Sequence, residues 1–440
     1  MNECRFKDIV LKNDGFLRGP FGSALKKSLF VPKSEQTYKV YEQSVVLQNN
    51  PNLGKYYISK EYFEKNMSRF EVKKGDFLVS CSGVNYGTIC YLNSNIEKGV
   101  INQALLRIRL DERKIYPLYF LYYFKSYIGK VITSGTGDST IPNFPSMSIV
   151  KEIPIDLPTY STQMYIGDLL NNISNKIAMN NKIISELESM AKTLYDYWFL
   201  QFDFPDENGK PYKSSGGKMV YNEELKREIP EGWEVKSLSQ VILSSKNGDW
   251  GNEISKAVND VQVRCFRGAD FSSIISDYNL TAPIRFISES HRDRLLMDGD
   301  LVIEISGGSP TQATGRIGYI NQSFLDRSDC AMTCSNFCKA FVPLSKNHQY
   351  WLYQTWKSYY DNGIMFNFES KTTGIKNLMF DDFCESIKVP VPCLELLQDY
   401  QNKVSAFYNL IQRSLNENSD LASLRDFLLP MLMNGQVTFK

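Results

Sequence analysis

The middle of the chain carries a regular spacing of apolar positions. Between residues 163 and 199 no proline interrupts the pattern, and the repeating positions alternate between steps of four and three. This heptad spacing predicts a long helix whose apolar stripe packs against a partner helix. About 35 residues at 1.5 Å each make a rod of roughly 50 Å. The positions of the seam are Ile173, Ile177, Asn180, Ile184, Leu187, Ala191, Leu194 and Trp198.

Asn180 is the polar member of this seam, and two interpretations of it remain open. A buried asparagine can set the register of a helix against its partner through a polar contact. The alternative is a locally solvated position on the helix surface.

A second, less regular helical pattern follows residue 393. Ser414, Asn418 and Arg425 interrupt its apolar stripe, and Pro430 is expected to end or kink the helix near Leu429. Because a one-sided stripe is unstable alone, the two helices are expected to pack on each other. They run antiparallel if a two-fold axis relates them. The apolar positions of this second seam are Phe407, Ile411, Leu421, Leu428 and Leu432.

Outside the helices, short apolar runs alternate with glycine- and serine-rich turns, which predicts α+β structure. One run, 75-GDFLVSCSG-83, returns as 299-GDLVIEISG-307. The proline before each long helix also recurs, as Pro158 and Pro392. The offset is 299 − 75 = 224 at the glycines and 392 − 158 = 234 at the prolines, a drift that small loop insertions produce. Matches in the same order indicate a duplicated half.

The second copy begins inside the chain. The stretch 229-IPEGWEVKSLSQV-241 has the shape of the N-terminal 4-CRFKDIVL-11, and a connector rich in Gly, Pro, Asp and Ser precedes it. The expected organisation is a first α+β domain at 1–158, a long helix at 159–200, a connector at 201–232, a second α+β domain at 233–392 and a long C-terminal helix at 393–440.

Composition limits the possible partners. The 440 residues carry a net charge of +1, so a nucleic-acid face must be a local basic patch that acidic surface elsewhere balances. The N-terminal stretch has no basic segment followed by an apolar core, and no run reaches the roughly 18 apolar residues of a membrane span. The nine cysteines are scattered, as in proteins of a reducing compartment. We expect a cytoplasmic protein without membrane contact.

The residues of common catalytic and metal sites are scarce. The chain has two histidines, too few for a His-rich site, and it lacks the phosphate-binding Walker A pattern. His348 lies in a polar loop and is expected on the surface. Aligning the two copies places Cys334 and Cys338 over Ile101 and Leu105, so these cysteines are expected in the core rather than on a metal. We expect no catalytic residue and no bound metal.

Three classes of loop recur in the two copies and combine glycine, hydroxyl, amide and basic side chains. Such loops can approach a phosphate backbone closely and place donors on base edges. The same composition is also that of solvated turns. The loops are residues 18–27, 80–88 and 133–140 in the first copy, and 244–252, 306–316 and 370–377 in the second. The candidate DNA-contacting residues, with Lys39 and Arg264 at matching positions, are Arg18, Ser23, Lys26, Lys27, Lys39, Ser82, Asn85, Tyr86, Thr136, Lys246, Arg264, Arg267, Ser306, Ser309, Arg316, Lys371 and Thr372.

Two α+β halves that are each followed by a long helix resemble the specificity subunit of a type I restriction–modification system. The stretches that carry the resemblance are 186-ELESMAKTLYDYWFLQFDFPDENGKPYKSSGGKMVYNEELKREIPEGWEVKSL-238 and 424-LRDFLLPMLMNGQV-437, with Gly-Pro-Phe-Gly-Ser at 19–23 in support. The resemblance implies two pseudo-symmetric target recognition domains, at 1–158 and 233–392, separated by two long antiparallel coiled-coil helices. Each domain then reads one part of a split DNA target.

The resemblance also implies the partners. The helices and nearby surfaces dock modification (methyltransferase) subunits, and through them a restriction (translocase and nuclease) subunit. S-adenosylmethionine, ATP and magnesium belong to those partners, and this chain binds no cofactor and catalyses nothing. A coiled-coil interaction scaffold without DNA binding is the alternative reading of the same sequence.

One detail departs from the family pattern, in which a glutamine follows the exit proline by about four residues. Gln163 lies five residues after Pro158, whereas Gln398 lies six after Pro392 and Gln401 lies beyond it. The resemblance therefore implies the docking geometry less firmly at the second exit than at the first.

Overall fold

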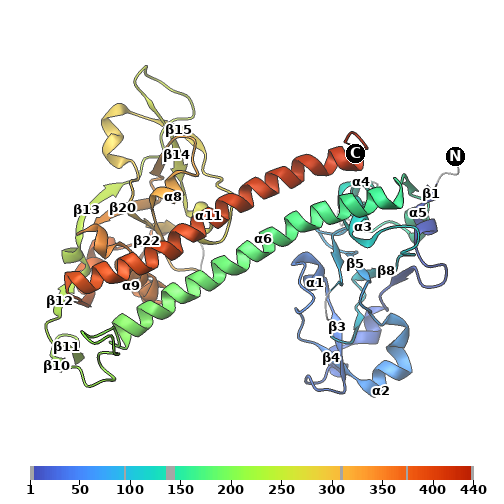
Figure 1. Ribbon diagram of the computed structural model, residues 1–440, viewed down its shortest axis with the longest axis horizontal. Coiled ribbons are helices and arrows are strands. Elements are labelled where there is room, and N and C mark those ends of the chain that lie inside the picture. Colours follow the sequence, from blue (N-terminus) through green and yellow to red (C-terminus); the bar gives the residue numbers. More distant parts are fainter. Residues whose placement is uncertain (1–3, 94–95, 135–143, 308–310, 373–374, 438–440) are drawn as a thin grey trace. The chain divides into compact units, whose positions relative to one another are not determined.

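The computed structural model describes residues 4–93, 96–134, 144–307, 311–372 and 375–437 (Figure 1). The chain divides into two compact units. Unit 1 comprises residues 1–175 and 422–440, and unit 2 comprises residues 176–421. Both units mix helices and strands, as the sequence predicts.

Unit 1 is built on three small sheets. In the four-stranded sheet every neighbouring pair is antiparallel, whereas the three-stranded sheet contains one parallel pair. The four-stranded order is β2 (Phe16–Arg18), β8 (Leu105–Ile108), β5 (Phe77–Ser80) and β6 (Ile89–Tyr91). The three-stranded order is β4 (Tyr57–Ser59), β3 (Thr37–Tyr41) and β7 (Gly99–Ile101), with β3 and β7 parallel. The last sheet pairs β1 (Cys4–Arg5) with β9 (Pro154–Ile155).

Unit 2 repeats this arrangement strand for strand. Its four-stranded order is β13 (Ile242–Asn247), β20 (Cys338–Pro343), β16 (Leu301–Glu304) and β18 (Ile317–Tyr319). Its three-stranded order is β15 (Ile284–Ile287), β14 (Val261–Phe266) and β19 (Ala331–Cys334), again with one parallel pair, β14 and β19. The entering and leaving strands pair as β12 (Glu234–Ser237) and β23 (Lys388–Val391). A further sheet joins β17 (Ser306–Gly307), β22 (Ile375–Leu378) and β21 (Glu369–Thr372). The sequence repeat is therefore a repeat of sheet order.

The strand register confirms the sequence alignment of the copies. Tyr41 lies opposite Ile101 in unit 1, and Phe266 lies opposite Cys334 in unit 2. Cys334 and Cys338 are buried in the apolar core of unit 2, as expected. His348 is also buried, with its Nδ1 2.8 Å from Ser345 Oγ, so its predicted surface position is wrong.

Short helices complete each unit. In unit 1 they are α1 (Gln43–Leu47), α2 (Lys60–Tyr62), α3 (Pro117–Tyr123), α4 (Gly129–Ser134) and α5 (Met147–Lys151). In unit 2 they are α7 (Ser272–Ile275), α8 (Gln322–Leu325), α9 (Gln349–Asp361) and α10 (Phe380–Ser386). The connector also folds, because it contains the hairpin β10 (Met219–Asn222) and β11 (Arg227–Pro230).

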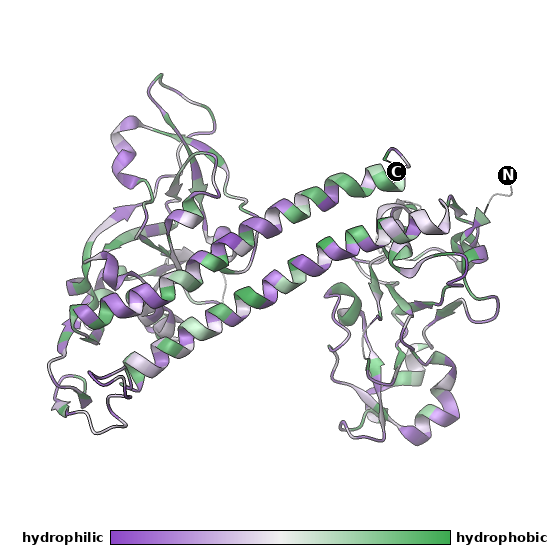
Figure 2. Ribbon diagram, in the orientation of Figure 1, coloured by the Kyte–Doolittle hydropathy of each residue, from purple (hydrophilic) through white to green (hydrophobic). Residues whose placement is uncertain are grey.

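Two long helices contribute to both units. α6 spans Tyr160–Tyr195 and continues as a π-helical turn to Leu200, and α11 spans Leu394–Met433. Apolar and polar residues alternate along both (Figure 2). Every predicted seam position of α6 is buried except Leu194, which is half-buried. Of the two predictions for Pro430, an end or a kink near Leu429, the end is wrong, because Pro430 lies inside α11 and its carbonyl accepts the backbone N–H of Asn434 at 3.0 Å.

Within unit 2 the two helices run antiparallel and side by side. Asn180 lies opposite Asn418, and Trp198 lies 5.9 Å from Tyr400, ring centroid to ring centroid. In unit 1, Leu432 of α11 belongs to the same apolar cluster as Ile166 and Leu170 of α6.

Candidate nucleic-acid interface

One end of the four-stranded sheet of unit 1 gathers three loops. Arg18 of β2 lies opposite Leu106 of β8, and Ser80 of β5 lies opposite Leu105. Because both strands are antiparallel to β8, the loops that follow β2 and β5 emerge beside the loop that precedes β8. Backbone hydrogen bonds join the three loops: Gly19 N donates to Leu105 O at 2.9 Å, and Cys81 N donates to Ala104 O at 2.8 Å.

The same end of the sheet in unit 2 gathers the corresponding loops. Asn247 of β13 lies opposite Lys339 of β20, and Glu304 of β16 lies opposite Cys338. The loops after β13 and β16 therefore emerge beside the loop before β20. Most candidate residues of the sequence analysis lie on or next to these loops in their own unit.

In unit 1 three of the four basic candidates are accessible, and Lys39 is not. Arg18, Ser23, Lys26, Lys27 and Asn85 are exposed. The Arg18 guanidinium lies 5.6 Å from the ring centroid of Phe144. Among the residues that the structure describes, Lys26 and Lys27 have no ion-pair partner. Ser82 is half-buried.

Two candidates of unit 1 lie inside the fold, and their assignment to DNA contact is wrong. Lys39 has no exposed surface; its Nζ donates to Pro51 O at 2.8 Å and lies 3.4 Å from Glu97 Oε1. Burial lowers the pKa of Lys39, and the Glu97 carboxylate opposes that shift. Tyr86 is 7% exposed, and its hydroxyl donates to Thr133 O at 2.9 Å.

In unit 2 every described basic candidate holds a carboxylate of its own fold. The pairs, with their N–O distances, are Lys246–Asp300 (2.6 Å), Arg264–Asp329 (2.9 Å), Arg267–Asp270 (2.9 Å) and Arg316–Glu304 (3.1 Å). The carboxylates fix the positions of the cations and neutralise much of their charge. These basic side chains are therefore hydrogen-bond donors held in fixed positions, and they do not form a strongly basic surface.

Among these cations, Lys246 is engaged in holding the fold together. It is mostly buried, and its Nζ donates to both Leu295 O (3.0 Å) and Asp300 Oδ2 (2.6 Å). Burial raises the pKa of Asp300, and the hydrogen bond from Lys246 opposes this shift.

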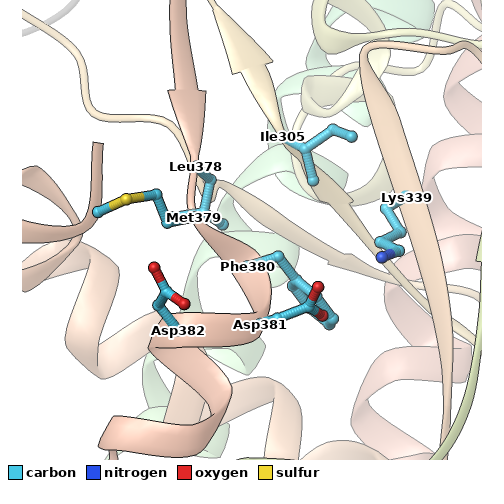
Figure 3. Close-up of a pocket in the computed structure, with 7 residues that line it drawn as sticks. All are labelled: Ile305, Lys339, Leu378, Met379, Phe380, Asp381 and Asp382. Carbon is cyan, nitrogen blue, oxygen red and sulfur yellow. The ribbon is translucent and has the colours of Figure 1, made fainter. Parts of the chain in front are cut away.

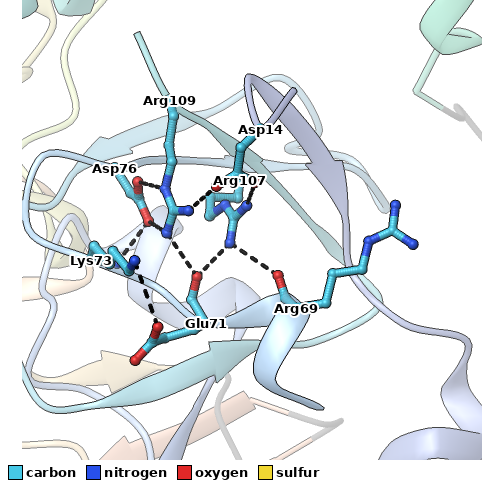
Figure 4. A network of polar contacts seen from close by, with 7 residues as sticks. All are labelled: Asp14, Arg69, Glu71, Lys73, Asp76, Arg107 and Arg109. Carbon is cyan, nitrogen blue, oxygen red and sulfur yellow. Dashed lines mark hydrogen bonds and ion pairs between the residues drawn. The ribbon is translucent and has the colours of Figure 1, made fainter. Parts of the chain in front are cut away.

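Unit 1 has a matching polar network around the buried Asp76, the counterpart of Asp300 (Figure 4). Arg109 Nε donates to Asp76 Oδ1 at 2.6 Å, and Asp14 pairs with both Arg107 and Arg109. Arg107 also donates to the carbonyl of Glu71. Protein acceptors engage both terminal nitrogens of Arg107, whose buried Nε has no partner, and the nitrogens of Arg109, so these arginines hold the sheet together and are not candidates for DNA contact.

The remaining candidates divide between the described and undescribed parts of the chain. Ser306 Oγ donates to Asn377 Oδ1 at 2.6 Å. Lys371 and Thr372 lie in β21, and nothing is described of their side chains. Thr136 and Ser309 lie outside the described residues.

A cavity of about 300 Å³ lies at this end of the unit 2 sheet (Figure 3). Lys339 lines it with its Nζ 4.6 Å from the ring centroid of Phe380. Asp381 and Asp382 of α10 line the same cavity. Because two carboxylates oppose one ammonium group, the cavity is a poor site for a phosphate.

Two exposed aromatic residues in these loops were missed by the sequence analysis. Phe21 is 91% exposed in the loop after β2, and Trp250 is 38% exposed in the loop after β13. An alignment of 19-GPFG-22 with 248-GDWG-251 would have paired them.

The described residues offer neither a metal site nor a membrane-spanning helix. No group of three or more His, Cys, Asp and Glu side chains could hold a metal ion there. None of the helices in this part of the chain is both long and apolar enough to cross a membrane.

Comparison with known proteins gives a consistent picture. Residues 21–189 match the family model of the type I restriction modification DNA specificity domain. The MjaIX specificity subunit of Methanocaldococcus jannaschii is 25% identical over 332 residues, which are 73% of this chain and 68% of the relative. The HindI specificity subunit of Haemophilus influenzae is 20% identical over 420 residues, 83% and 87% of the two chains.

A solved structure supports the fold over the full length. The S subunit of a type I restriction–modification system from M. genitalium superposes with a TM-score of 0.60 at 16% identity, covering 98% of this chain and 95% of that chain. At this identity the likeness concerns the fold alone. The family match, the curated relatives and the repeated sheet order agree: residues 21–189 match the DNA specificity domain of type I restriction–modification systems, and the chain is similar along most of its length to specificity subunits of such systems.

Proposed function

We propose that this chain is the non-catalytic DNA specificity subunit of a type I restriction–modification enzyme. Residues 1–158 and 233–392 are its two target recognition domains, and each reads one part of a bipartite sequence in double-stranded DNA. The observation that carries the proposal is the repeated sheet, which presents the same three loops at the same end in each unit.

The long helices, with the connector at 201–232 between them, link the two recognition domains in this proposal. Paired antiparallel helices of fixed length would set the number of unread base pairs between the two half-sites. Their exposed faces, which include Met179 and Met190 on α6, offer apolar surface for modification subunits. A restriction subunit would join through the modification subunits. S-adenosylmethionine, ATP and magnesium would then be bound by those partners, and the complex would act in the cytoplasm.

Two different kinds of contact are available to the recognition domains. In unit 1, exposed Arg18, Lys26 and Lys27 suit the phosphate backbone. In unit 2, Arg267 and Arg316 are held in place by Asp270 and Glu304, which suits directional hydrogen bonds to base edges. The expected result is an unequal electrostatic contribution from the two halves.

A gel-shift titration of the chain with its modification subunit tests the proposal. We expect specific binding of one bipartite duplex, with an affinity that falls steeply as salt rises. A duplex with one scrambled half-site is the control. Absent binding, or binding that neither salt nor the scrambled half-site weakens, would instead support a coiled-coil scaffold without a DNA role.

A further inference from the structure

The loops that follow β2 and β13 begin in the same way. A Cβ atom on Gly19 would lie 1.7 Å from the carbonyl oxygen of Asn102, and one on Gly248 would lie 1.9 Å from that of Ser335. Asn102 and Ser335 are themselves counterparts, because their N–H groups donate to Tyr41 O and Phe266 O at 3.0 and 2.8 Å. Each loop therefore begins with a glycine in close contact with the equivalent carbonyl group of its own unit.

A matching amide side chain lies against the next residues of each loop. A Cβ atom on Gly22 would lie 2.1 Å from Gln103 Oε1. In unit 2 the Asn336 Oδ1 accepts the backbone N–H of Trp250 at 3.2 Å. Since Gln103 and Asn336 each follow the matched carbonyl residue directly, Phe21 and Trp250 occupy the same place in the two copies.

Both aromatic side chains are exposed although their loops are held firmly. The Ala24 N–H donates to Phe21 O at 2.9 Å, and the Tyr62 hydroxyl donates to Ala24 O at 2.8 Å. In unit 2, Asp249 Oδ1 accepts the Gly251 N–H at 2.9 Å, and Asp249 Oδ2 lies 2.6 Å from His291 Nδ1. A large apolar ring held in water by an ordered loop is unfavourable in the free protein and marks a contact surface.

The surroundings of the two rings suit a polyanion with flat faces. The exposed Arg18, Lys26 and Lys27 lie in the same short stretch as Phe21. Glu42 is a carboxylate among the residues that line a cavity with Phe21 and Lys27. In unit 2 the Arg285 guanidinium lies 4.4 Å from the ring centroid of Trp250 and pairs with Glu253 at 2.8 Å. A cation on an aromatic face holds the ring in one orientation.

We propose that Phe21 and Trp250 are paired stacking residues that insert against DNA bases, one in each half of the target. This inference rests on the proposed function and goes beyond it, because it assigns a role in deforming the duplex. Apolar side chains that enter a base step unstack it and kink the duplex, and aromatic side chains stack on any base. Each residue would thus contribute affinity and sensitivity to the deformability of its base step.

The test uses the full chain with its modification subunit and target duplexes that carry 2-aminopurine at successive positions, once methylation mapping has identified the target. We expect the wild-type complex to raise the fluorescence at one step in each half-site. Phe21→Ala should abolish the rise in one half-site and Trp250→Ala in the other. Each should weaken binding by on the order of tenfold to a hundredfold. Phe21→Trp and Trp250→Phe should keep the signal.

Tyr221→Ala removes an exposed aromatic residue from the connector hairpin and is the matched control, expected to leave both signals unchanged. Wild-type fluorescence and affinity in Phe21→Ala and Trp250→Ala would overturn this inference while leaving DNA recognition intact. Loss of the modification subunit from these variants would overturn it in favour of a protein contact. Failure of the wild-type complex to bind any duplex specifically would instead remove the proposed function itself.

Discussion

The side chains of Asn180 and Asn418 meet between the two long helices of unit 2, with the Asn180 amide nitrogen donating to Asn418 Oδ1 at 2.9 Å. Both are buried, at 2% and 0% exposure. Asn418 Nδ2 in turn donates to Asn181 Oδ1 at 2.9 Å. The open choice about Asn180 is therefore settled in favour of the polar contact. Asn418 is one of the three residues that interrupt the second seam in the sequence.

Loss of one asparagine should destabilise unit 2 more than loss of both. Asn180→Leu leaves the Asn418 carbonyl without its buried donor, which should cost about 1–3 kcal/mol of unfolding free energy. Asn180→Leu with Asn418→Leu replaces both partners by apolar side chains and should recover most of that loss. Urea unfolding of the two single variants and the double variant gives the coupling energy. Strictly additive effects would show that the pair is not a coupled contact.

A glutamine near the start of each long helix holds the start of a shorter helix. Gln163 Oε1 accepts the Tyr116 N–H at 2.9 Å, and Gln401 Oε1 accepts the Tyr350 N–H at 3.3 Å. Gln401 is therefore the counterpart of Gln163, whereas Gln398 is exposed. Asn180 and Asn418 follow the two glutamines at the same separation, 180 − 163 = 17 and 418 − 401 = 17. Equivalent asparagines of the two copies thus bond to each other.

Removing either glutamine should loosen the helix start that it caps. Gln163→Ala and Gln401→Ala each leave a buried N–H without its acceptor, at a cost of about 1–3 kcal/mol. Hydrogen exchange at the Tyr116 and Tyr350 amides should accelerate in the respective variant. Gln398→Ala is the surface control and should change the unfolding free energy by less than about 0.5 kcal/mol. Faster exchange in Gln398→Ala than in Gln401→Ala would refute the assignment.

The cations of the two units should respond differently to substitution. Lys26→Ala with Lys27→Ala removes two exposed charges, so the slope of log affinity against log salt should fall by about 2 with no loss of fold stability. Lys246→Ala leaves Asp300 buried and unpaired, so it should cost about 3–5 kcal/mol of stability. Salt-dependent DNA binding and urea unfolding of both variants separate the two effects. An unchanged salt slope in the double variant would remove these lysines from the interface.

The sequence was sufficient for the order of elements because the repeat and the heptad spacing are periodic signals. The buried seam of α6 and the core positions of Cys334 and Cys338 follow from that periodicity. The partner of an individual cation is set by strand register and loop geometry, which no periodicity encodes. Lys39 and Arg264 align correctly, yet Lys39 is buried on Glu97 and Arg264 is held on Asp329. The number of polar and basic residues in the loops could not show which cation is buried and which lies at the surface.

The exposed rings of Phe21 and Trp250 were missed for the opposite reason. Phe21 and Trp250 belong to the residue types that usually enter a core, so composition alone assigns them there. Their exposure is seen only in the structure, where the paired glycines of the two loops lie against the matched carbonyls of Asn102 and Ser335. The signal was present in the sequence, but it needed the residue-level alignment of the two loops.

One carboxyl group links stability to pH. Burial raises the pKa of Glu188 on α6 from its ordinary value of 4.5 to about 7, with Lys357 opposing and Asp361 adding to the shift. Between these values the folded state binds more protons than the unfolded state, so the free energy of unfolding falls as the pH rises. Above pH 7 the full cost of the buried charge is present.

Glu188→Gln should remove that cost. At pH 8 the variant should be more stable than the wild type by about 1–3 kcal/mol, and the difference should shrink as the pH is lowered toward 5. Urea unfolding midpoints of the two proteins across this range measure the difference. Glu186→Gln, on the exposed side of α6, is the control and should show little pH-dependent difference. A variant that is less stable than the wild type at pH 8 would contradict the raised pKa.

Genome-wide methylation sequencing of cells that express this chain and its modification subunit tests the central claim most directly. We predict methylation at two short half-sites separated by an unread spacer. Seven residues added between 175 and 176 and seven between 421 and 422 lengthen each helix by roughly 10 Å, so the spacer should change while both half-sites stay the same. A single contiguous motif, or a spacer that ignores the longer helices, would contradict the account.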